Sequence, residues 1–360
     1  MLKVEGPLGL DQGISVTFDS LGKTFHSRIA GTVVNVQLPG LRVHELADEA
    51  GEPPGYIEIV APEWTAEPWG WVDVEKLPFA ESNSQWGQVV FTDWTNKDGQ
   101  PSGIASVSQA RFWFDGTADF EGTSELGREV MAARDAWWSL VVEWVETISF
   151  QMVGARDDIQ LQRSRALTRS LWTTSDEGST LIETGSYSWH RIISQRPLTL
   201  GGLERAFELA GRGVQPSLGW QLLRDAHHAQ AYGELRRAIV EMASALEVGS
   251  AMWLEHRLER TEAEIRKFII GNMGTLGKRI QSMKEMGWVE PEGIKKVVQL
   301  RNQAVHAGSA PAVGDTAQAL ASTLNALKSF DPPHAKLMSE STIEPPAIAV
   351  PPALLANATV

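Results

Sequence analysis

The spacing of apolar residues changes near Pro197, and this change constrains the fold more than any other feature of the sequence. Before it, short runs of β-branched and aromatic residues alternate with turn residues. After it, apolar residues recur at helical spacing almost without interruption. A chain of 360 residues is long enough for two domains. We therefore expect a β-rich domain over residues 1–196, a helical domain over residues 197–330, and a tail over residues 331–360.

The N-terminal part should be a sheet with a helix packed against it. Strands are expected at Gly13–Phe18, Gly31–Leu38, Tyr56–Val60, Gln88–Thr92 and Val107–Phe114. Strands at such short spacing favour an antiparallel sandwich or barrel. Apolar residues at helical spacing predict a helix over Glu125–Met152, and a further strand pair is expected at Arg165–Trp172 and Thr180–Ile193. The fold class is therefore α+β, with a β-rich N-terminal domain and an all-α C-terminal bundle.

The C-terminal part should be a series of helices bounded by capping residues and glycines. The expected helices are Leu200–Arg212, Ser217 to about Tyr232, Glu234–Arg260, Glu262–Ile270, Thr275–Met286, Pro291 to about Ala307, and Asp315 to Phe330. Ser217 and Asp315 are the expected N-caps of their helices, and Gly308 ends the helix before it. The tail that begins at Asp331 is rich in Pro and Ala, so we expect it to be disordered.

The net charge of −13 is unevenly placed along the chain. Residues 1–200 hold 15 Lys and Arg against 28 Asp and Glu, a net of −13, whereas the remaining residues hold 17 of each. An acidic surface repels phosphate groups, so the first half is a poor candidate for the main contact with a nucleic acid. An ordinary acidic, solvated surface is the simpler interpretation of this charge.

The absence of cysteine excludes disulfides, thiolate metal sites and a cysteine nucleophile. No apolar run approaches the roughly eighteen residues of a membrane helix. The first residues, Met1–Pro7, lack the basic-then-apolar pattern of a secretion signal. We expect a cytoplasmic protein that has no membrane segment and binds neither a metal nor another cofactor.

Tryptophan is concentrated in the first half, which holds 11 of the 14. Exposed tryptophans on a β scaffold can stack on sugars or bases, whereas buried ones fill a core. Trp137, Trp138 and Trp144 lie in one apolar helical stretch, so core filling is the better interpretation for them. Three others, in a loop with Pro and Glu, are the candidates for ligand contact: Trp64, Trp69 and Trp71.

The helix expected from Pro291 to Ala307 carries the run Arg301-Asn302-Gln303-Ala304-Val305-His306 near its end. Asn302 and His306 are four residues apart and project from one helix face, and the Arg301 side chain is long enough to reach over the same region. Histidine changes charge near neutral pH, and a guanidinium fits a pair of phosphate oxygens. These groups suit metal-free phosphodiester cleavage, with His306 transferring protons and Arg301 stabilising charge.

A structural alternative exists for the same residues. Arg301 can pair with a carboxylate on a neighbouring helix, and His306 can cap the C-terminus of its own helix. An Arg and a His at this spacing also arise often by chance. The spacing alone therefore favours the structural alternative.

The surrounding sequence resembles bacterial HEPN domains, and this favours the catalytic interpretation. Four blocks occur in the family's order and spacing: Leu218–Ala226, Gly233–Glu247, Thr275–Ile280 and Leu300–Gly308. The resemblance covers roughly residues 198–330 and does not extend to the first half of the chain. It implies a helical bundle that dimerises, so that two Arg-x4-His motifs face one another in a composite cleft.

The resemblance also implies an activity and a set of site residues. HEPN proteins cut RNA without a metal, often as toxins, in phage defence or in RNA processing. By this resemblance Arg301 and His306 are the catalytic pair, and Asn302 is the polar residue that follows the arginine. An acidic residue on the earlier long helix often supports the motif, and Glu241 is the candidate here, with Glu247 as second choice. Some HEPN domains are inactive and serve only for dimerisation or ligand binding, which is the alternative function.

Basic residues near the motif are candidates for contact with RNA phosphates. The pairs Arg236–Arg237 and Lys295–Lys296 are the first candidates, although a solvated helix face is the better interpretation for each residue taken alone. The expected partners are an RNA substrate, a second copy of the chain, and a phage-derived or cellular trigger that acts on the N-terminal domain.

Overall fold

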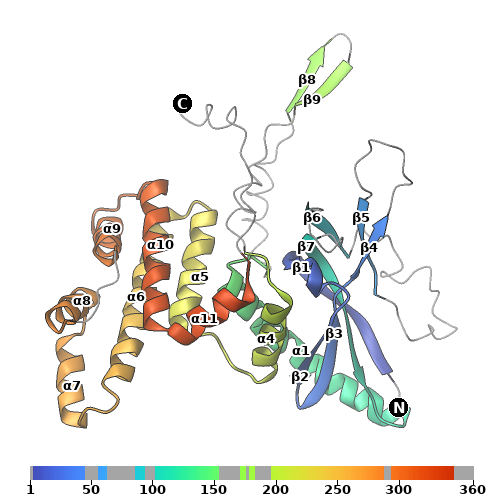
Figure 1. Ribbon diagram of the computed structural model, residues 1–360, viewed down its shortest axis with the longest axis horizontal. Coiled ribbons are helices and arrows are strands. Elements are labelled where there is room, and N and C mark those ends of the chain that lie inside the picture. Colours follow the sequence, from blue (N-terminus) through green and yellow to red (C-terminus); the bar gives the residue numbers. More distant parts are fainter. Residues whose placement is uncertain are drawn as a thin grey trace.

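The computed structural model describes residues 3–44, 56–62, 86–93, 102–153, 171–175, 178–182, 196–287 and 293–343 (Figure 1). Within these ranges an antiparallel sheet is followed along the chain by a series of helices. The expected α+β class is therefore confirmed.

The long strand β7 (Ser102–Asp115) is the centre of the main sheet. Strand β1 (Lys3–Thr17) pairs along one edge of β7, from Lys3 opposite Asp115 to Thr17 opposite Ile104. Strands β3 (Thr32–Gln37) and β6 (Gly87–Asp93) share the other edge, and β2 (Thr24–Ile29) lies outside β3. All these pairings are antiparallel.

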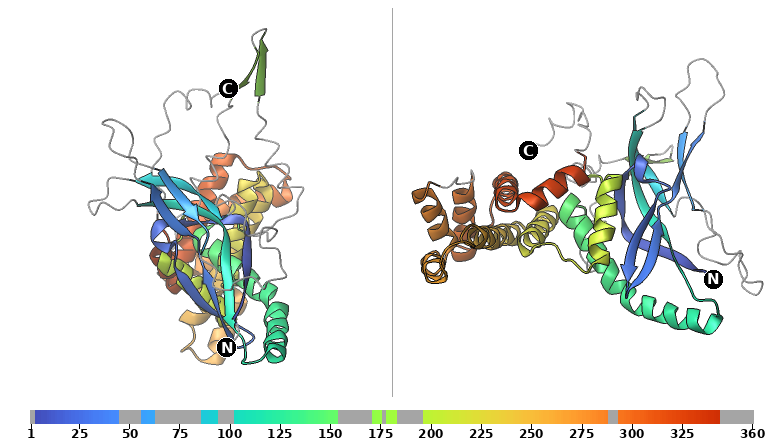
Figure 2. Two further views of the ribbon diagram at one scale, coloured as in Figure 1. Left: turned by 90° about the vertical axis from the view of Figure 1, so that its right-hand side faces the viewer. Right: turned by 60° about the horizontal axis from the view of Figure 1, so that its bottom comes forward.

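Shorter elements accompany this sheet. Strands β4 (Gly40–His44) and β5 (Tyr56–Val60) form one two-stranded ribbon, and β8 (Leu171–Ser175) and β9 (Gly178–Ile182) form another. The expected sandwich or barrel is wrong for the part of the chain that the structure describes, because the five main strands form one open sheet. Helices, not a second sheet, cover its apolar face (Figure 2).

Strand β2 was not expected from the sequence, and its burial pattern explains why. Its residues alternate between exposed and buried, but the middle buried position is Ser27. The Ser27 hydroxyl donates to the Phe207 carbonyl at 2.7 Å and accepts from the Trp137 indole at 2.9 Å. A buried polar residue with such partners breaks the hydrophobic alternation by which a strand is identified.

Helix α1 (Phe120–Ser149) packs on the sheet together with helix α4 (Leu200–Gly211). The Asp119 side chain caps α1 by accepting from the Gly122 amide at 2.7 Å. The helix begins five residues before the expected Glu125, and it ends at Phe150, which has a φ of 56°. The core role expected for the tryptophans is confirmed for Trp137 and Trp144, which are 4% and 5% exposed.

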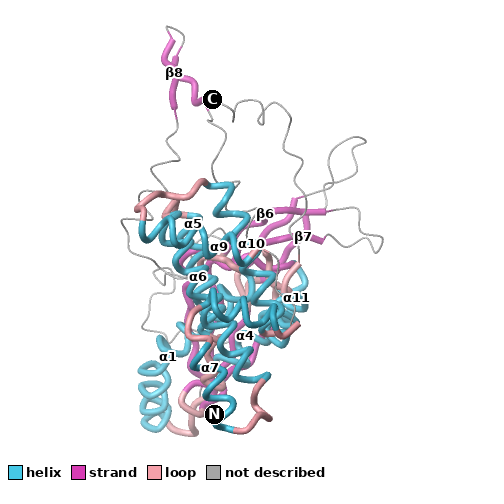
Figure 3. Tube along the Cα trace, turned by 90° about the vertical axis from the view of Figure 1, so that its left-hand side faces the viewer, coloured by secondary structure: helices cyan, strands magenta, loops and turns pink. Residues whose placement is uncertain are grey.

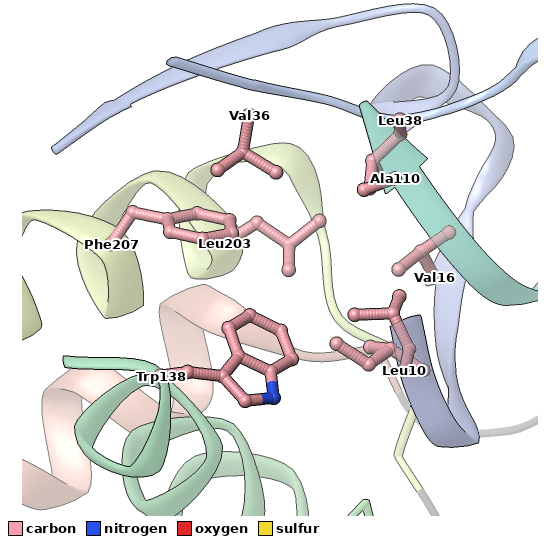
Figure 4. Close-up of a pocket in the computed structure, with 9 residues that line it drawn as sticks. Leu10, Val16, Val36, Leu38, Ala110, Trp138, Leu203 and Phe207 are labelled. Atoms are coloured by element: carbon pink, nitrogen blue, oxygen red, sulfur yellow. The ribbon is translucent and has the colours of Figure 1, made fainter. Parts of the chain in front are cut away.

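The core under the sheet contains a small cavity (Figure 4). Its volume is about 10 Å³, which is at the lower limit for a single water molecule. The lining is apolar throughout and offers a water no hydrogen-bond partner, with Leu203, Phe207 and Trp138 on the helix side. This cavity is therefore a packing defect and not a ligand site.

Most of the remaining helices form a second core: α5 (Leu218–Ala231), α6 (Leu235–Arg257), α8 (Leu276–Glu285), α9 (Ile294–His306) and α10 (Val313–Phe330). Helix α7 (Ala263–Asn272) packs instead against a small separate cluster at the end of α6, formed by Leu254, Leu258 and Met273. These helices match the expected helices in order, and Figure 3 shows them in front of the strands. The N-cap of α10 is Ala312 and not the expected Asp315, which lies in the first turn. In the described part of the chain, no helix is both long enough and apolar enough to cross a bilayer.

The expected boundary at residue 197 does not separate the two cores. Helix α4 follows this boundary, yet its buried residues Leu203, Ala206 and Phe207 belong to the core of the sheet. The Phe207 ring stacks on Phe25 of β2, with 5.3 Å between the ring centroids. The helical bundle proper therefore begins at α5.

The expectation of disorder from residue 331 is wrong for its first part. Residues Pro332–Ser341 form helix α11, whose N-cap Asp331 accepts from the His334 amide. Pro332 stands at the start of this helix, where a proline is favourable because its missing N–H is not needed. The residues after α11 then connect to the sheet. Leu198 forms one β-bridge with Thr342 of this segment and another with Val16 of β1. The rest of the tail, residues 344–360, lies outside the described residues.

Candidate functional site

The candidate motif lies in the last two turns of α9. Gly293 begins this helix with a φ of 86°, and Gly308 follows its end with a φ of 66°. Both values favour glycine because a Cβ is strained there. Four apolar side chains fix α9 to the bundle: Ile294, Val297, Leu300 and Ala304. The opposite side of the helix faces outward, so the motif is presented at a defined and exposed helix end.

Arg301, Asn302 and His306 lie together at this end. Arg301 is half-buried, and its Nη1 donates to the Asn302 side-chain oxygen at 3.2 Å. Asn302 and His306 are exposed. Among the described residues, no hydrogen bond or ion pair engages the imidazole of His306, and no carboxylate pairs with Arg301. The ion pair required by the structural alternative is therefore absent from the described part of the protomer.

Arg236 and Arg237 are neighbours on α6, but they have different partners. The Arg236 Nη2 donates to the backbone carbonyl of Ala304 at 3.0 Å, which joins α6 to the end of α9. Arg237 pairs with Glu234 at 3.1 Å and with Glu241 at 3.8 Å, both on its own side of α6. The two arginines differ because adjacent helical residues point about 100° apart.

The acidic residues proposed to support the motif have other partners in this protomer. The Glu241 carboxylate pairs with Arg237, and its described interactions do not include Arg301 or His306. Glu247 is exposed, and its backbone carbonyl accepts from the Arg279 guanidinium. Arg279 also donates to Ser250 and to the Met273 carbonyl, and burial lowers its pKa. Neither acid therefore supports His306 directly within one chain.

The two lysines at the start of α9 also differ. The Lys296 amine pairs with Asp315 of α10 at 3.1 Å. Lys295 is exposed on the adjacent side of the first turn. An ion pair between half-exposed side chains is weak, on the order of 1 kcal/mol or less, so Lys296 can still exchange Asp315 for a phosphate.

His227 of α5 and His334 of α11 lie near the junction of these helices with α1, and they are poor candidates for proton transfer. Burial lowers the pKa of His334 to about 4, and it lowers the pKa of His227 to about 4 as well. His334 stacks between Trp220 and Trp144, with centroid distances of 4.3 and 5.8 Å. Both rings are therefore neutral at neutral pH. In the described ranges, no group of three or more His, Asp or Glu side chains is arranged to hold a metal ion.

Sequence reasoning missed this aromatic junction, although one signal for it is present. Asp331-Pro332-Pro333 is a helix start, with a capping side chain followed by proline at the first helical positions. Asp331 also accepts from the Trp220 indole at 3.0 Å. The tryptophans considered for ligand contact, Trp64, Trp69 and Trp71, lie outside the described residues.

No family model, curated protein or solved structure matches this chain.

Proposed function

We propose that this protein is a metal-independent endoribonuclease whose catalytic residues are Arg301 and His306. The observation that carries the proposal is the exposure and the pairing of these two side chains at the end of α9. His306 is exposed, and no described residue pairs with it or neutralises Arg301. An imidazole and a guanidinium at one helix end are the groups that phosphodiester cleavage needs. The HEPN-like blocks of sequence around them support the same assignment.

The chemistry assigns a role to each group. The 2′-hydroxyl of the RNA attacks the adjacent phosphorus and loses its proton to a neutral imidazole. A bond from O2′ to phosphorus forms, and the bond from phosphorus to O5′ breaks. A protonated imidazole then gives a proton to the departing O5′. Arg301 stabilises the charge that develops on the equatorial phosphate oxygens. The products are a 2′,3′-cyclic phosphate and a 5′-hydroxyl.

This scheme needs one proton acceptor and one proton donor at the same time, whereas one chain supplies a single His306. A homodimer that brings two α9 ends together supplies both, as the HEPN resemblance implies. Two exposed apolar side chains suit such an interface, namely Val305 within the motif and Val313 at the start of α10, which are 45% and 66% exposed. Asn302 lies beside Arg301 and is a candidate for orienting the phosphate.

The N-terminal half serves as the regulatory part of this proposed enzyme. Its acidity makes it a poor RNA surface, and α1 packs against both α4 and α5. The binding of a trigger molecule to the sheet can therefore affect the helical bundle through the direct contacts of α1 with α4 and α5. This arrangement fits a toxin or an anti-phage effector that acts in the cytoplasm, with a phage-derived or cellular molecule as the trigger.

The test compares the full-length protein with Arg301→Ala and His306→Ala in RNA cleavage, with EDTA present. His256→Ala is the matched control, because His256 also lies in the last turn of an exposed helix end, where it pairs with Glu259 at 3.6 Å. We expect the two motif variants to lose cleavage and the control to keep it. Equal cleavage by all four proteins would refute the assignment. If the wild type dimerises but cuts no RNA, the alternative of a non-catalytic dimerisation or ligand-binding protein is favoured.

A further inference from the structure

Arg236 is the side chain that connects the long helix α6 to the end of α9. Its Nη2 donates to the Ala304 carbonyl at 3.0 Å, two residues before His306. The last carbonyls of a helix have no amide partner within the helix. The left-handed conformation of Gly308 turns the chain away at this point. A charged donor from a neighbouring helix is a strong substitute for the missing amide.

The base of the Arg236 side chain is fixed to the rigid part of the bundle. The residues that follow it on α6 include Ala238, Ile239 and Met242, which are fully buried. The other arginine at this place, Arg237, contacts only α6 side chains in its described interactions. The contact with α9 is therefore a property of position 236 and not of a general basic surface.

We infer that Arg236 is a positioning residue that holds the last turn of α9, and with it His306, in the geometry that cleavage requires. This inference rests on the proposed function. The sequence predicted a phosphate contact for Arg236, whereas its hydrogen bond in the described part of the chain goes to the Ala304 carbonyl, which favours the positioning role. Small displacements of a catalytic group lower the rate of the chemical step much more than they lower substrate affinity.

The kinetic test uses the full-length protein and an RNA oligonucleotide, with Arg236→Gln, Arg236→Lys and the control Arg205→Gln on α4. We expect Arg236→Gln to lower kcat about 10- to 100-fold and to leave KM unchanged. Lysine can still donate one hydrogen bond to the carbonyl, so Arg236→Lys should recover part of kcat. Arg205→Gln should behave as the wild type, because Arg205 belongs to α4 and pairs with Glu208 of the same helix. A rise in KM with unchanged kcat, together with a weaker salt dependence of binding, would show phosphate contact and overturn the inference.

A second measurement does not depend on RNA cleavage. Amide hydrogen exchange at residues 304–308 should be several-fold faster in Arg236→Gln than in Arg205→Gln or in the wild type, because the last turn of α9 loses its anchor. Unchanged exchange in Arg236→Gln would overturn the inference even if RNA is cut. If the wild type cuts no RNA, the proposed function fails and the role in catalysis fails with it, while exchange still decides whether Arg236 anchors α9.

Discussion

Lowering the pH should destabilise this protein through His334, and the structure gives the size of the effect. The His334 ring is 6% exposed and lies between the indoles of Trp220 and Trp144. Burial lowers its pKa to about 4, although the Asp331 carboxylate and the backbone of Thr147 partly oppose this shift. The folded protein therefore holds this ring neutral under conditions where an unfolded chain would protonate it.

The sign and magnitude follow from the two pKa values. Above pH 6.5, the ring is neutral in both states and His334 adds no dependence on pH. As the pH falls from 6.5 to about 4, the unfolded state gains a proton that the folded state rejects, so the free energy of unfolding decreases. The full loss is about 3 kcal/mol, at 1.36 kcal/mol per pKa unit, and about 2 kcal/mol of it appears by pH 5.

The assay is urea denaturation at pH 7.5 and pH 5, for the wild type and for His334→Phe. Phenylalanine keeps an aromatic ring between the two indoles but does not titrate, so it should reduce the loss of stability between these pH values by about 2 kcal/mol. The exposed His256 provides the control, and His256→Phe should keep the pH dependence of the wild type. If His334→Phe loses as much stability as the wild type between pH 7.5 and pH 5, the reasoning is refuted.

Two further predictions concern the stability of the helical part of the chain. Gly293→Ala places a Cβ at a φ of 86° and against the Ser322 side chain, so it should lower the free energy of unfolding by about 1–3 kcal/mol in urea denaturation. Gly314 is a helical glycine with open space around it, so Gly314→Ala should raise the free energy of unfolding slightly. Equal effects of the two substitutions on the free energy of unfolding would contradict this explanation. Ending the chain after Phe330 removes α11 and uncovers Trp220, so the melting temperature should fall below that of a chain that ends after Ile343. Equal melting temperatures would show that α11 contributes nothing.

Much of the fold was predictable because its signals are local. Runs of β-branched residues predicted β3 and β5, and capping residues and glycines predicted most helix ends. Strand β2 was missed because its buried Ser27 depends on hydrogen bonds to Trp137 and Phe207, which are 110 and 180 residues away. The packing of α4 on the sheet depends on equally distant contacts, so spacing assigned this helix to the wrong core.

The candidate site shows the same division between local and distant causes. The helix that carries Arg301 and His306, and its end at Gly308, follow from the sequence nearby. The bond from Arg236 to Ala304 joins residues 68 positions apart, and only the packing of α6 against α9 creates it. Sequence reasoning could identify Arg236 as basic, but it could not distinguish its role from that of Arg237.

Analysis of the RNA products in EDTA tests the central claim most directly. Wild-type protein should convert an RNA oligonucleotide to fragments that end in a 2′,3′-cyclic phosphate and begin with a 5′-hydroxyl. It should fail to cut at a position that carries a 2′-deoxy sugar, and His306→Ala should produce no fragments at all. If His306→Ala produces the same fragments as the wild type, the motif at the end of α9 is not the catalytic site.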